Sequence, residues 1–239
     1  MTKQGATAAS KRQASFDKAK SKRRDDILAA AEALIRSTGS TDFSMKELAE
    51  AAGISTYTTY NLIGSKSTVF YILLNNSIDQ INLKRLISGS DHDPVSQIFF
   101  AGSAVAEVFD ADAEFYRPLM RHLLGVLDPI HRPAYMKRAF EYWLAAFAPI
   151  EEAGLLRDGV TAMSLARTVQ VFFTGAIDFW VHAEVTGEEL RQQIKLGLAI
   201  CLQSQNLVGW ESQISRMITE AGADVANLGS RLMASAELR

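Results

Sequence analysis

The pattern of apolar positions along the chain predicts helices almost throughout. Between residues 22 and 38, Ile27, Leu28, Ala31, Leu34 and Ile35 recur at helical spacing and form one apolar face. Faces of the same period follow beyond residue 44, and no alternating run is long enough to predict a strand. The pattern therefore predicts an all-α protein.

Capping residues and breaks divide these helices. The run 44–47 (Ser-Met-Lys-Glu) has the spacing of a capping box, and 186–189 (Thr-Gly-Glu-Glu) resembles another. Ser55 and Ser65 can cap two further helices. Breaks are expected at 88–94, at 128–129, between 149 and 159, and at 186–187.

The composition is that of a globular protein. The chain has 239 residues, of which 48% are hydrophobic and 22% charged, and Cys201 is its single cysteine. One cysteine allows no internal disulfide, which fits a reducing compartment. There is no signal-like start and no run of roughly 18 apolar residues. We therefore expect a cytoplasmic protein that does not enter a membrane.

Charge is unevenly distributed. The formal net charge is −2, yet residues 1–24 hold eight lysines and arginines and one acid, Asp17. A basic end on an acidic body favours a polyanionic partner at that end, although a merely solubilising arm would look the same. Residues 1–21 are also poor in apolar side chains, so they cannot offset their ordering entropy and are expected to form a mobile arm.

The most specific feature is the run 43–70. It predicts two short helices joined by a tight turn at Gly53, where a positive φ favours glycine, and Ala49 is small enough for the helices to approach closely. No acid lies between Glu50 and Asp79, so this surface suits phosphate. A helical hairpin with a polar face would share these features, but a helix-turn-helix explains them together.

Residues 24–74 resemble the DNA-binding region of the tetracycline-repressor (TetR) family. The run 44–55 (Ser-Met-Lys-Glu-Leu-Ala-Glu-Ala-Ala-Gly-Ile-Ser) closely matches the family pattern of a helix, Ala-Gly and a hydroxyl residue. Four later positions are in register, namely Thr58, Tyr60, Ser65 and Lys66. Four others depart from the pattern, namely Thr59, Leu62, Ile63 and Ser67. Leu62 cannot donate a hydrogen bond where the family contacts phosphate, whereas Ile63 can keep a core role.

The resemblance implies residue roles in DNA binding. The implied phosphate contacts are Ser44, Thr58, Tyr60 and Lys66, with Lys46 near the DNA backbone. Hydroxyl, aromatic and amide groups suited to base edges are carried by Thr56, Tyr57 and Asn61. Arg23 and Arg24 either reach the minor groove or begin a solvated helix.

The resemblance implies a three-helix DNA-binding domain (22–70) and a larger helical domain for effector binding and dimerisation (71–205). The arm (1–21) precedes them, and a helical extension (206–239) reaches beyond the family minimum. Fourteen aromatic residues lie between 99 and 180. They could line a ligand pocket or simply fill an ordinary hydrophobic core. The candidate effector contacts are Tyr116, His122, Tyr135, Trp143, Phe173 and Asp178. Asp178 needs a partner if it is buried, and otherwise faces solvent or a second subunit.

A homodimer on a roughly palindromic operator is a further implication. Two apolar stripes suit the last helix pair, which in the family packs against its copy: Leu165, Val169, Phe172, Ala176 and Trp180, then Leu190, Ile194, Gly197, Leu198 and Cys201. The extension carries a heptad-like face that could cover its own domain or clasp the second subunit: Trp210, Ile214, Met217, Ala221, Val225, Leu228 and Leu232.

The function expected is a transcription regulator, a repressor released by a small apolar or aromatic effector. Control by a protein partner is the alternative, and a cavity of roughly 300 Å³ or more would favour the effector. An enzyme has little support, because no catalytic or metal-spaced motif occurs and no cofactor is implied. Four histidines are scattered (His92, His122, His131 and His182), and Cys201 lies on an apolar helix.

Overall fold

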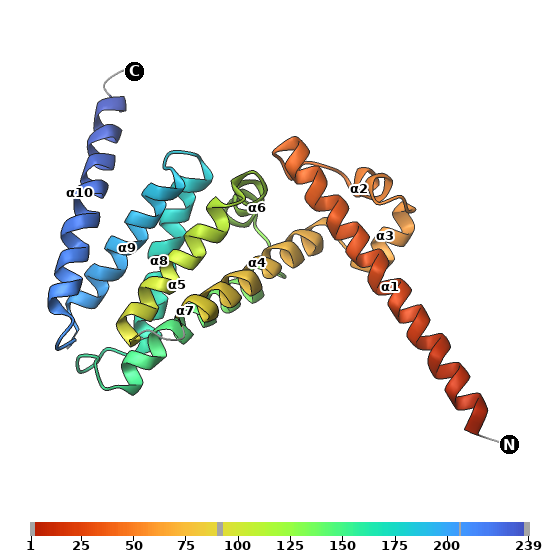
Figure 1. Ribbon diagram of the computed structural model, residues 1–239. Coiled ribbons are helices and arrows are strands. Elements are labelled where there is room, and N and C mark those ends of the chain that lie inside the picture. The colour runs from red at the N-terminus through yellow and green to blue at the C-terminus, as the bar shows by residue number, and fades with distance from the viewer. Residues whose placement is uncertain (1–2, 90–92, 206, 237–239) are drawn as a thin grey trace. The chain divides into compact units, whose positions relative to one another are not determined.

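The computed structural model describes residues 3–89, 93–205 and 207–236, and over these residues its regular structure is entirely helical (Figure 1). The expected all-α class is confirmed. The chain divides into two compact units, Met1–Leu74 and Asn75–Arg239. The boundary lies four residues beyond the one expected from the sequence, because the helix that starts at Lys66 continues without a break through it.

The first unit contains the predicted short helices. Its elements are α1 (Lys3–Thr38), α2 (Met45–Ala51), α3 (Thr56–Ile63) and the first part of α4 (Lys66–Gly89). Ile27, Ala31 and Ile35 of α1 are fully buried, as the helical spacing predicted. They share the core of this unit with Leu48 and Phe70, which are also fully buried. The small core therefore holds α1 against α2 and α3.

The N-terminal segment differs from its expected irregular form. Residues 3–21 continue α1 without interruption, and every described side chain from 10 to 26 is exposed. Isolated helices are limited by the cost of nucleation, but here the packed end of α1 supplies the nucleus. The segment is also rich in Ala and Lys, which are strong helix formers. Apolar burial is thus unnecessary for it to be helical.

The second unit is a larger bundle. Its elements are the rest of α4, α5 (Pro94–Asp110), α6 (Ala113–Gly125), α7 (Arg132–Glu152), α8 (Ala162–Val181), α9 (Gly187–Gln203) and α10 (Glu211–Ala236). Large side chains from four different helices fill the core, and Phe109, Leu119, Phe147 and Trp180 are buried almost completely. The rings of Phe109 and Trp180 stack with centroids 6.1 Å apart.

Caps and breaks in the second unit follow the sequence. Thr186 and Glu189 form the predicted reciprocal capping box at the start of α9. The interruptions near 128, between 153 and 161, and before 187 all separate helices as expected. Of the break expected at 88–94, residues 90–92 lie outside the described part of the chain, and Asp93 caps α5.

The extension covers its own domain. Ile214, Ala221 and Leu228 of α10 are buried, and α10 packs along α9 (Figure 1). Two ion pairs also tie α10 to α9, Lys195–Glu220 at 3.2 Å and Arg231–Glu189. The Leu232 side chain lies outside the described residues. Of the two possibilities left open by the heptad-like face, the structure shows the intramolecular one.

The two stripes expected on the last helix pair are mostly interior. Leu165, Val169, Ala176 and Trp180 of α8 are buried within the protomer, as are Leu190, Ile194 and Leu198 of α9. Gly197 is needed where α8 and α9 approach, because a Cβ there would lie 2.3 Å from the Phe172 ring. The stripes therefore build this domain's own core, so a dimer would have to use other faces of these helices.

Candidate functional site

The α2–turn–α3 segment has the geometry of a helix-turn-helix. Gly53 has φ +66°, a left-handed conformation that favours glycine, and its N–H donates to Glu50 O at 3.1 Å. The Ile54 N–H donates to Ala49 O at 3.0 Å and closes the turn. Ala49 is buried where the two helices approach. The predicted tight turn is confirmed by these bonds.

Both short helices begin at the predicted hydroxyl caps. Ser44 Oγ accepts from Glu47 N–H at 3.2 Å, and the Glu47 carboxylate accepts from Ser44 N–H at 2.6 Å. The hydrogen bond from the Ser44 N–H to the carboxylate is the main cause of a lowered pKa of Glu47. Ser55 Oγ accepts from Thr58 N–H at 3.2 Å and caps α3. Local hydrogen bonds thus set both helix starts.

The outer face of α3 presents aromatic and amide groups. Tyr57 is 77% exposed and Tyr60 52% exposed, and Asn61 is exposed beside them. Tyr57, Tyr60 and Asn61 are spaced three and four residues apart, so they share one side of the helix. Thr56 is half-buried at the start of α3. The structure therefore brings together the predicted base-edge residues Tyr57 and Asn61 on a single row.

Two departures from the family pattern have a structural explanation. Thr59 is fully buried, and its hydroxyl donates to Ser55 O at 3.2 Å, so the smaller polar side chain is satisfied inside the unit. Ile63 is 5% exposed and keeps the core role expected of it. Leu62 is half-buried. The core-facing side of α3 is therefore complete without the usual residues.

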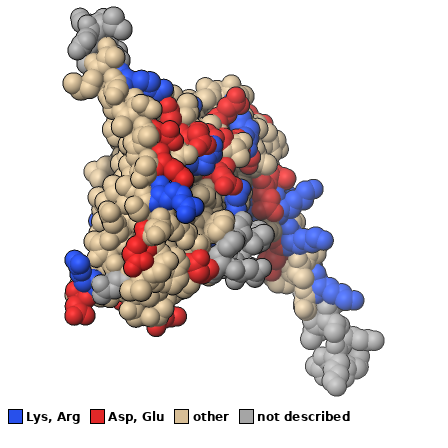
Figure 2. Space-filling model, turned by 60° about the vertical axis from the view of Figure 1, so that its left-hand side comes forward, with Lys and Arg blue, Asp and Glu red and all other residues tan. Residues whose placement is uncertain are grey.

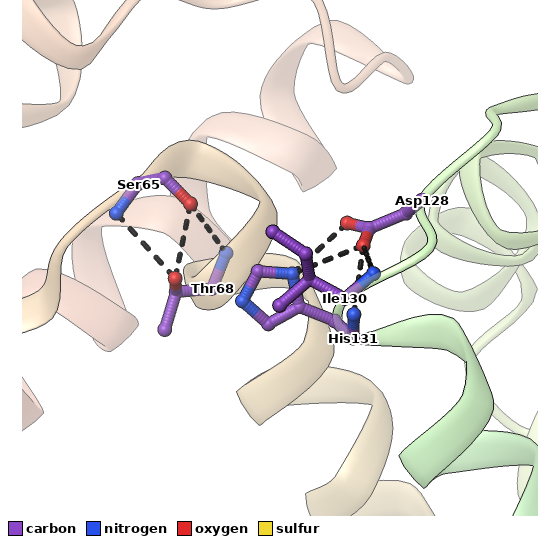
Figure 3. Close-up of polar contacts among 5 residues, drawn as sticks. All are labelled: Ser65, Thr68, Asp128, Ile130 and His131. Carbon is purple, nitrogen blue, oxygen red and sulfur yellow. Dashed lines mark hydrogen bonds and ion pairs between the residues drawn. The ribbon is translucent and has the colours of Figure 1, made fainter.

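Ser65 and Thr68 cap the start of α4 reciprocally (Figure 3). The Thr68 N–H donates to Ser65 Oγ at 3.2 Å, and the Ser65 N–H donates to Thr68 Oγ1 at 3.4 Å. Their hydroxyls are 3.0 Å apart. The cap predicted at Ser65 is confirmed.

Lys66 has a bracing role that the sequence did not indicate. Its Nζ donates to Thr41 O and to Phe43 O, both at 3.0 Å. The same ammonium lies 5.7 Å from the ring centroids of both Phe43 and Phe70. An ammonium has three donors, so only one remains for the phosphate contact that the resemblance implies. Nothing in the spacing of residues 41, 43 and 66 signalled this contact.

The remaining DNA-binding candidates differ in their surroundings. The hydroxyl group of Thr58 is hydrogen-bonded to Ser55 Oγ at 2.8 Å. Lys46 is exposed and lies 3.8 Å from the exposed carboxylate of Glu50. Arg23 and Arg24 are exposed on α1, about one turn before the buried residue Ile27. All of these side chains belong to the first unit.

A cavity of about 60 Å³ lies inside the second unit. Its lining comes from five helices: Ile78 and Ile81 of α4, Val105 and Phe109 of α5, Met120, Leu123 and Leu124 of α6, Tyr135, Met136, Ala139, Tyr142 and Trp143 of α7, and Gln170, Phe173, Thr174 and Ile177 of α8. None of these side chains carries a formal charge at neutral pH. The cavity is smaller than the roughly 300–1,000 Å³ of typical ligand sites, so its volume does not meet the criterion that would favour an effector over a protein partner.

Three of the six predicted effector contacts line this cavity, and three do not. Tyr135, Trp143 and Phe173 are at the wall, where the rings of Trp143 and Phe173 lie 5.7 Å apart. Tyr116 is buried elsewhere and donates to Gln80 Oε1 at 3.2 Å. The Asp178 side chain is 53% exposed beside His182, so it faces outward, as the sequence allowed. His122 is absent from the lining.

The polar groups at the wall are committed to the protein. Tyr142 Oη donates to Ala101 O at 2.6 Å, and burial raises the pKa of Tyr142 above its ordinary value. Gln170 Nε2 donates to Met136 O at 2.7 Å, and Thr174 Oγ1 donates to Gln170 O at 2.7 Å. Sequence reasoning missed Gln170 and Tyr142. Gln170, a polar residue on an otherwise apolar row, was the signal available.

A second hydrogen-bonded cluster lies between α6 and α7 (Figure 3). One oxygen of Asp128 accepts from the N–H groups of Ile130 and His131, at 3.0 and 2.7 Å. The His131 ring nitrogen Nδ1 is 3.0 Å from the other carboxylate oxygen. The bond from His131 N–H is the main cause of a lowered pKa of Asp128. The cluster fixes the turn that leads into α7.

The described residues contain no helix long and apolar enough to span a bilayer. Over the same residues, no three His, Cys, Asp or Glu side chains gather in a way that could hold a metal ion. Cys201 is a free, half-buried thiol, and burial raises its pKa.

Comparison with solved structures finds proteins of similar fold, whereas comparison of the sequence does not. No protein-family model and no curated protein matches the sequence. Thermus thermophilus FadR, a TetR-family repressor solved with lauroyl-CoA, is 22% identical, with a TM-score of 0.62 over 77% of this chain and 95% of its own. SmeT, the repressor of the Stenotrophomonas maltophilia efflux pump SmeDEF, is 18% identical, with a TM-score of 0.59 over 78% and 91%.

TylP, a TetR regulator from Streptomyces fradiae, is 18% identical, with a TM-score of 0.58 over 84% of this chain and 98% of its own. At these identities the likeness concerns the fold. The chain therefore has the fold of TetR-family regulators, with an N-terminal helix-turn-helix unit followed by a larger helical domain.

Proposed function

We propose that this protein is a sequence-specific, DNA-binding transcription regulator of the TetR type, acting as a repressor. The observation that carries the proposal is the α2–turn–α3 unit with Tyr57, Tyr60 and Asn61 on one exposed row. A helix of this size enters the major groove, where an amide pairs with adenine and rings contact thymine methyl groups. The similar fold of solved repressors supports the assignment.

Phosphate contacts would surround this row. Ser44 and Thr58 keep hydroxyl groups near the N-termini of α2 and α3, where helix dipoles favour anions. Lys46 and the third donor of Lys66 supply positive charge nearby. These groups set affinity, whereas the α3 row sets sequence preference.

The protein would act in the cytoplasm as a homodimer on a two-fold site. The exposed large apolar side chains of α8 and α9 are the surface available for the second copy, namely Met163, Val171, Phe179 and Ile200. A two-fold interface makes the operator roughly palindromic, with half-sites about one turn apart.

Release from DNA would follow binding of a small neutral, apolar molecule in the second unit. The uncharged aromatic lining supports this chemistry, because an ionised ligand would find no counter-charge at the wall. With a volume of about 60 Å³, the cavity must enlarge to hold more than a very small ligand. Binding would therefore select a more open conformer whose recognition helices no longer match the half-sites.

DNA binding is tested by fluorescence anisotropy of the full chain on a duplex selected from a random library, against a scrambled duplex, at two salt concentrations. We expect tighter binding to the selected duplex that persists at the higher salt. Asn61→Ala should reduce the preference between bases, whereas Lys46→Ala should weaken both duplexes alike and lower the salt slope by about one. Equal binding of the wild type to both duplexes would refute the proposal.

The effector is tested by calorimetry with two probes of similar size, indole and benzoate. We expect indole to bind and benzoate not to bind, because the lining lacks a cation. Ala139→Leu, which fills part of the cavity, should abolish indole binding and leave DNA affinity unchanged. Failure of indole to bind or to affect DNA binding would favour control by a protein partner instead.

A further inference from the structure

Residues 10–24 of α1 form a basic helical segment that no described part of its own unit covers. Residues 10–24 include seven lysines and arginines and one acid, Asp17, and all of their side chains are exposed. Asp17 accepts from Gln13 Nε2 at 3.1 Å. Within the described residues, none of the seven bases forms an ion pair. Figure 2 shows Lys and Arg side chains standing clear of the surface along this helix.

The packed row of α1 continues into basic residues. Ile27, Ala31 and Ile35 face α2 and α3, and residues three or four apart on a helix lie above one another. Arg24 precedes Ile27 by three positions, and Lys20 precedes Arg24 by four. Lys20 and Arg24 therefore lie on the same side of α1 as the helix-turn-helix, beyond the end of its core.

The other lysines of the segment lie on the opposite side. Lys18 precedes Ile27 by nine positions and Lys22 precedes Ala31 by nine, which is two and a half helical turns. Lys11 precedes Lys18 by seven, about two turns, and so shares its side. The helix thus carries one basic row that continues the packed side and another that faces away from it.

We propose that the row Lys20, Arg23 and Arg24 binds the phosphate backbone of the same DNA that α3 reads, outside the segment contacted by α3. Arg23 adjoins the row and is exposed with it. This inference rests on the proposed function, because it takes α3 to be the reading helix. The partner is identified by charge complementarity, since a duplex presents one negative charge per roughly 1.7 Å of its length.

The length of the helix suits this partner. From Lys3 to Ile27 the helix rises by about 36 Å, close to one turn of duplex. A membrane surface fits less well, because interfacial helices need an apolar face and Phe16 is the one large apolar side chain between residues 10 and 26. The extension would lengthen the DNA footprint beyond the half-sites and compensate for Leu62, which cannot donate to phosphate.

The test compares two triple variants of the full chain that remove the same charge. The row variant carries Lys20→Gln, Arg23→Gln and Arg24→Gln, and the opposite-face variant carries Lys11→Gln, Lys18→Gln and Lys22→Gln. Glutamine keeps a helix propensity close to those of Lys and Arg, and circular dichroism checks that both variants stay helical. DNA affinity is measured by fluorescence anisotropy across a series of salt concentrations. Two duplexes are used: a long one that contains the selected site, and a short one that contains only its two half-sites.

We expect the row variant to bind the long duplex on the order of tenfold or more weakly and to lower its salt slope by two to three, about one per lost phosphate contact. The opposite-face variant should stay near the wild type, and both variants should differ little on the trimmed site. Equal losses in the two variants would overturn the inference, because net charge alone would explain them. An unchanged row variant would overturn it as well.

Two further outcomes are separable. Binding to vesicles of anionic phospholipid that depends on the row, with DNA affinity unchanged, would identify a membrane partner and overturn the inference. Failure of the proposed function appears differently, as equal affinity of the wild type for selected and scrambled duplexes. In that case the salt slopes of the two triple variants still decide whether the row binds a polyanion.

Discussion

Lys66 holds its ammonium group between two phenylalanine rings and two backbone carbonyls, although its register with the TetR pattern implies a phosphate contact. The two roles are compatible, because the carbonyl bonds orient the side chain and leave one N–H for an anion. At this scale, the proposed phosphate contact would make one residue serve both the stability of the first unit and its affinity for DNA.

Lys66→Met should therefore destabilise the first unit by about 2–3 kcal/mol, since it leaves the carbonyls of Thr41 and Phe43 without their charged donor. Urea unfolding followed by circular dichroism measures the change. Lys46→Met is the matched control, because the Lys46 side chain is 77% exposed and should change stability by less than about 0.5 kcal/mol. Equal stabilities of the two variants would contradict the bracing role.

At the scale of elements, two helices each begin with the same kind of cap, an ionised glutamate in a capping box. Glu47 at the start of α2 and Glu189 at the start of α9 each accept a backbone N–H from the cap residue, and this bond is the main cause of their lowered pKa values. When the pKa of a glutamate is lower in the folded state, its ionised form stabilises the fold at pH values above the ordinary pKa of 4.5. This stabilisation is lost as the pH falls through the pKa of the folded state.

The free energy of unfolding should accordingly be insensitive to these two groups near pH 7 and fall as the pH drops below about 4.5. Glu47→Gln and Glu189→Gln keep an oxygen acceptor but not the charge, so each should show a shallower acid loss than the wild type. Unfolding midpoints measured from pH 7 to pH 3 test this. Parallel curves for wild type and variants would show that the ionised caps do not contribute.

The approach of α8 to α9 depends on Gly197. A methyl group there would meet the Phe172 ring, so Gly197→Ala should lower the free energy of unfolding by about 1–3 kcal/mol. Gly229→Ala on α10 is the control, because nothing lies within 4 Å of its added Cβ and alanine is the better helix former. The control should be neutral or up to about 1 kcal/mol more stable. Chemical denaturation of both variants distinguishes packing from helix propensity.

At the scale of the whole molecule, the proposed dimer would use the outer faces of α8 and α9, since their inner stripes are buried within the protomer. Val171 is 58% exposed on α8. Val171→Lys should convert the dimer to a monomer without loss of thermal stability, because a charge tolerated in solvent is costly in an apolar interface. Light scattering after size-exclusion chromatography measures the mass.

Leu127→Lys serves as the control for assembly, because Leu127 is 92% exposed between α6 and α7, away from the proposed interface. It should remain dimeric and bind a two-half-site duplex normally. A Val171→Lys protein that remains dimeric would place the interface elsewhere.

Much of the first unit was predictable from the sequence. The capping box at Ser44, the Gly53 turn and the apolar row from Ile27 to Ile35 all appear where the pattern placed them. Each depends on contacts between residues at most four positions apart, or on a single backbone conformation, and such interactions leave a regular trace in sequence. The helical state of residues 3–21 was missed because burial was weighed above helix propensity.

The contacts that the pattern did not show join residues far apart in the chain. Lys66 reaches the carbonyls of residues 41 and 43, and the cavity wall combines side chains from α4 to α8. Periodicity shows that a helix has an apolar side but not which neighbour covers it. For that reason the sequence could predict α3 and its exposed face, whereas the lining of the cavity, the covering of α9 by α10 and the exposed face of α8 depend on how the helices pack together.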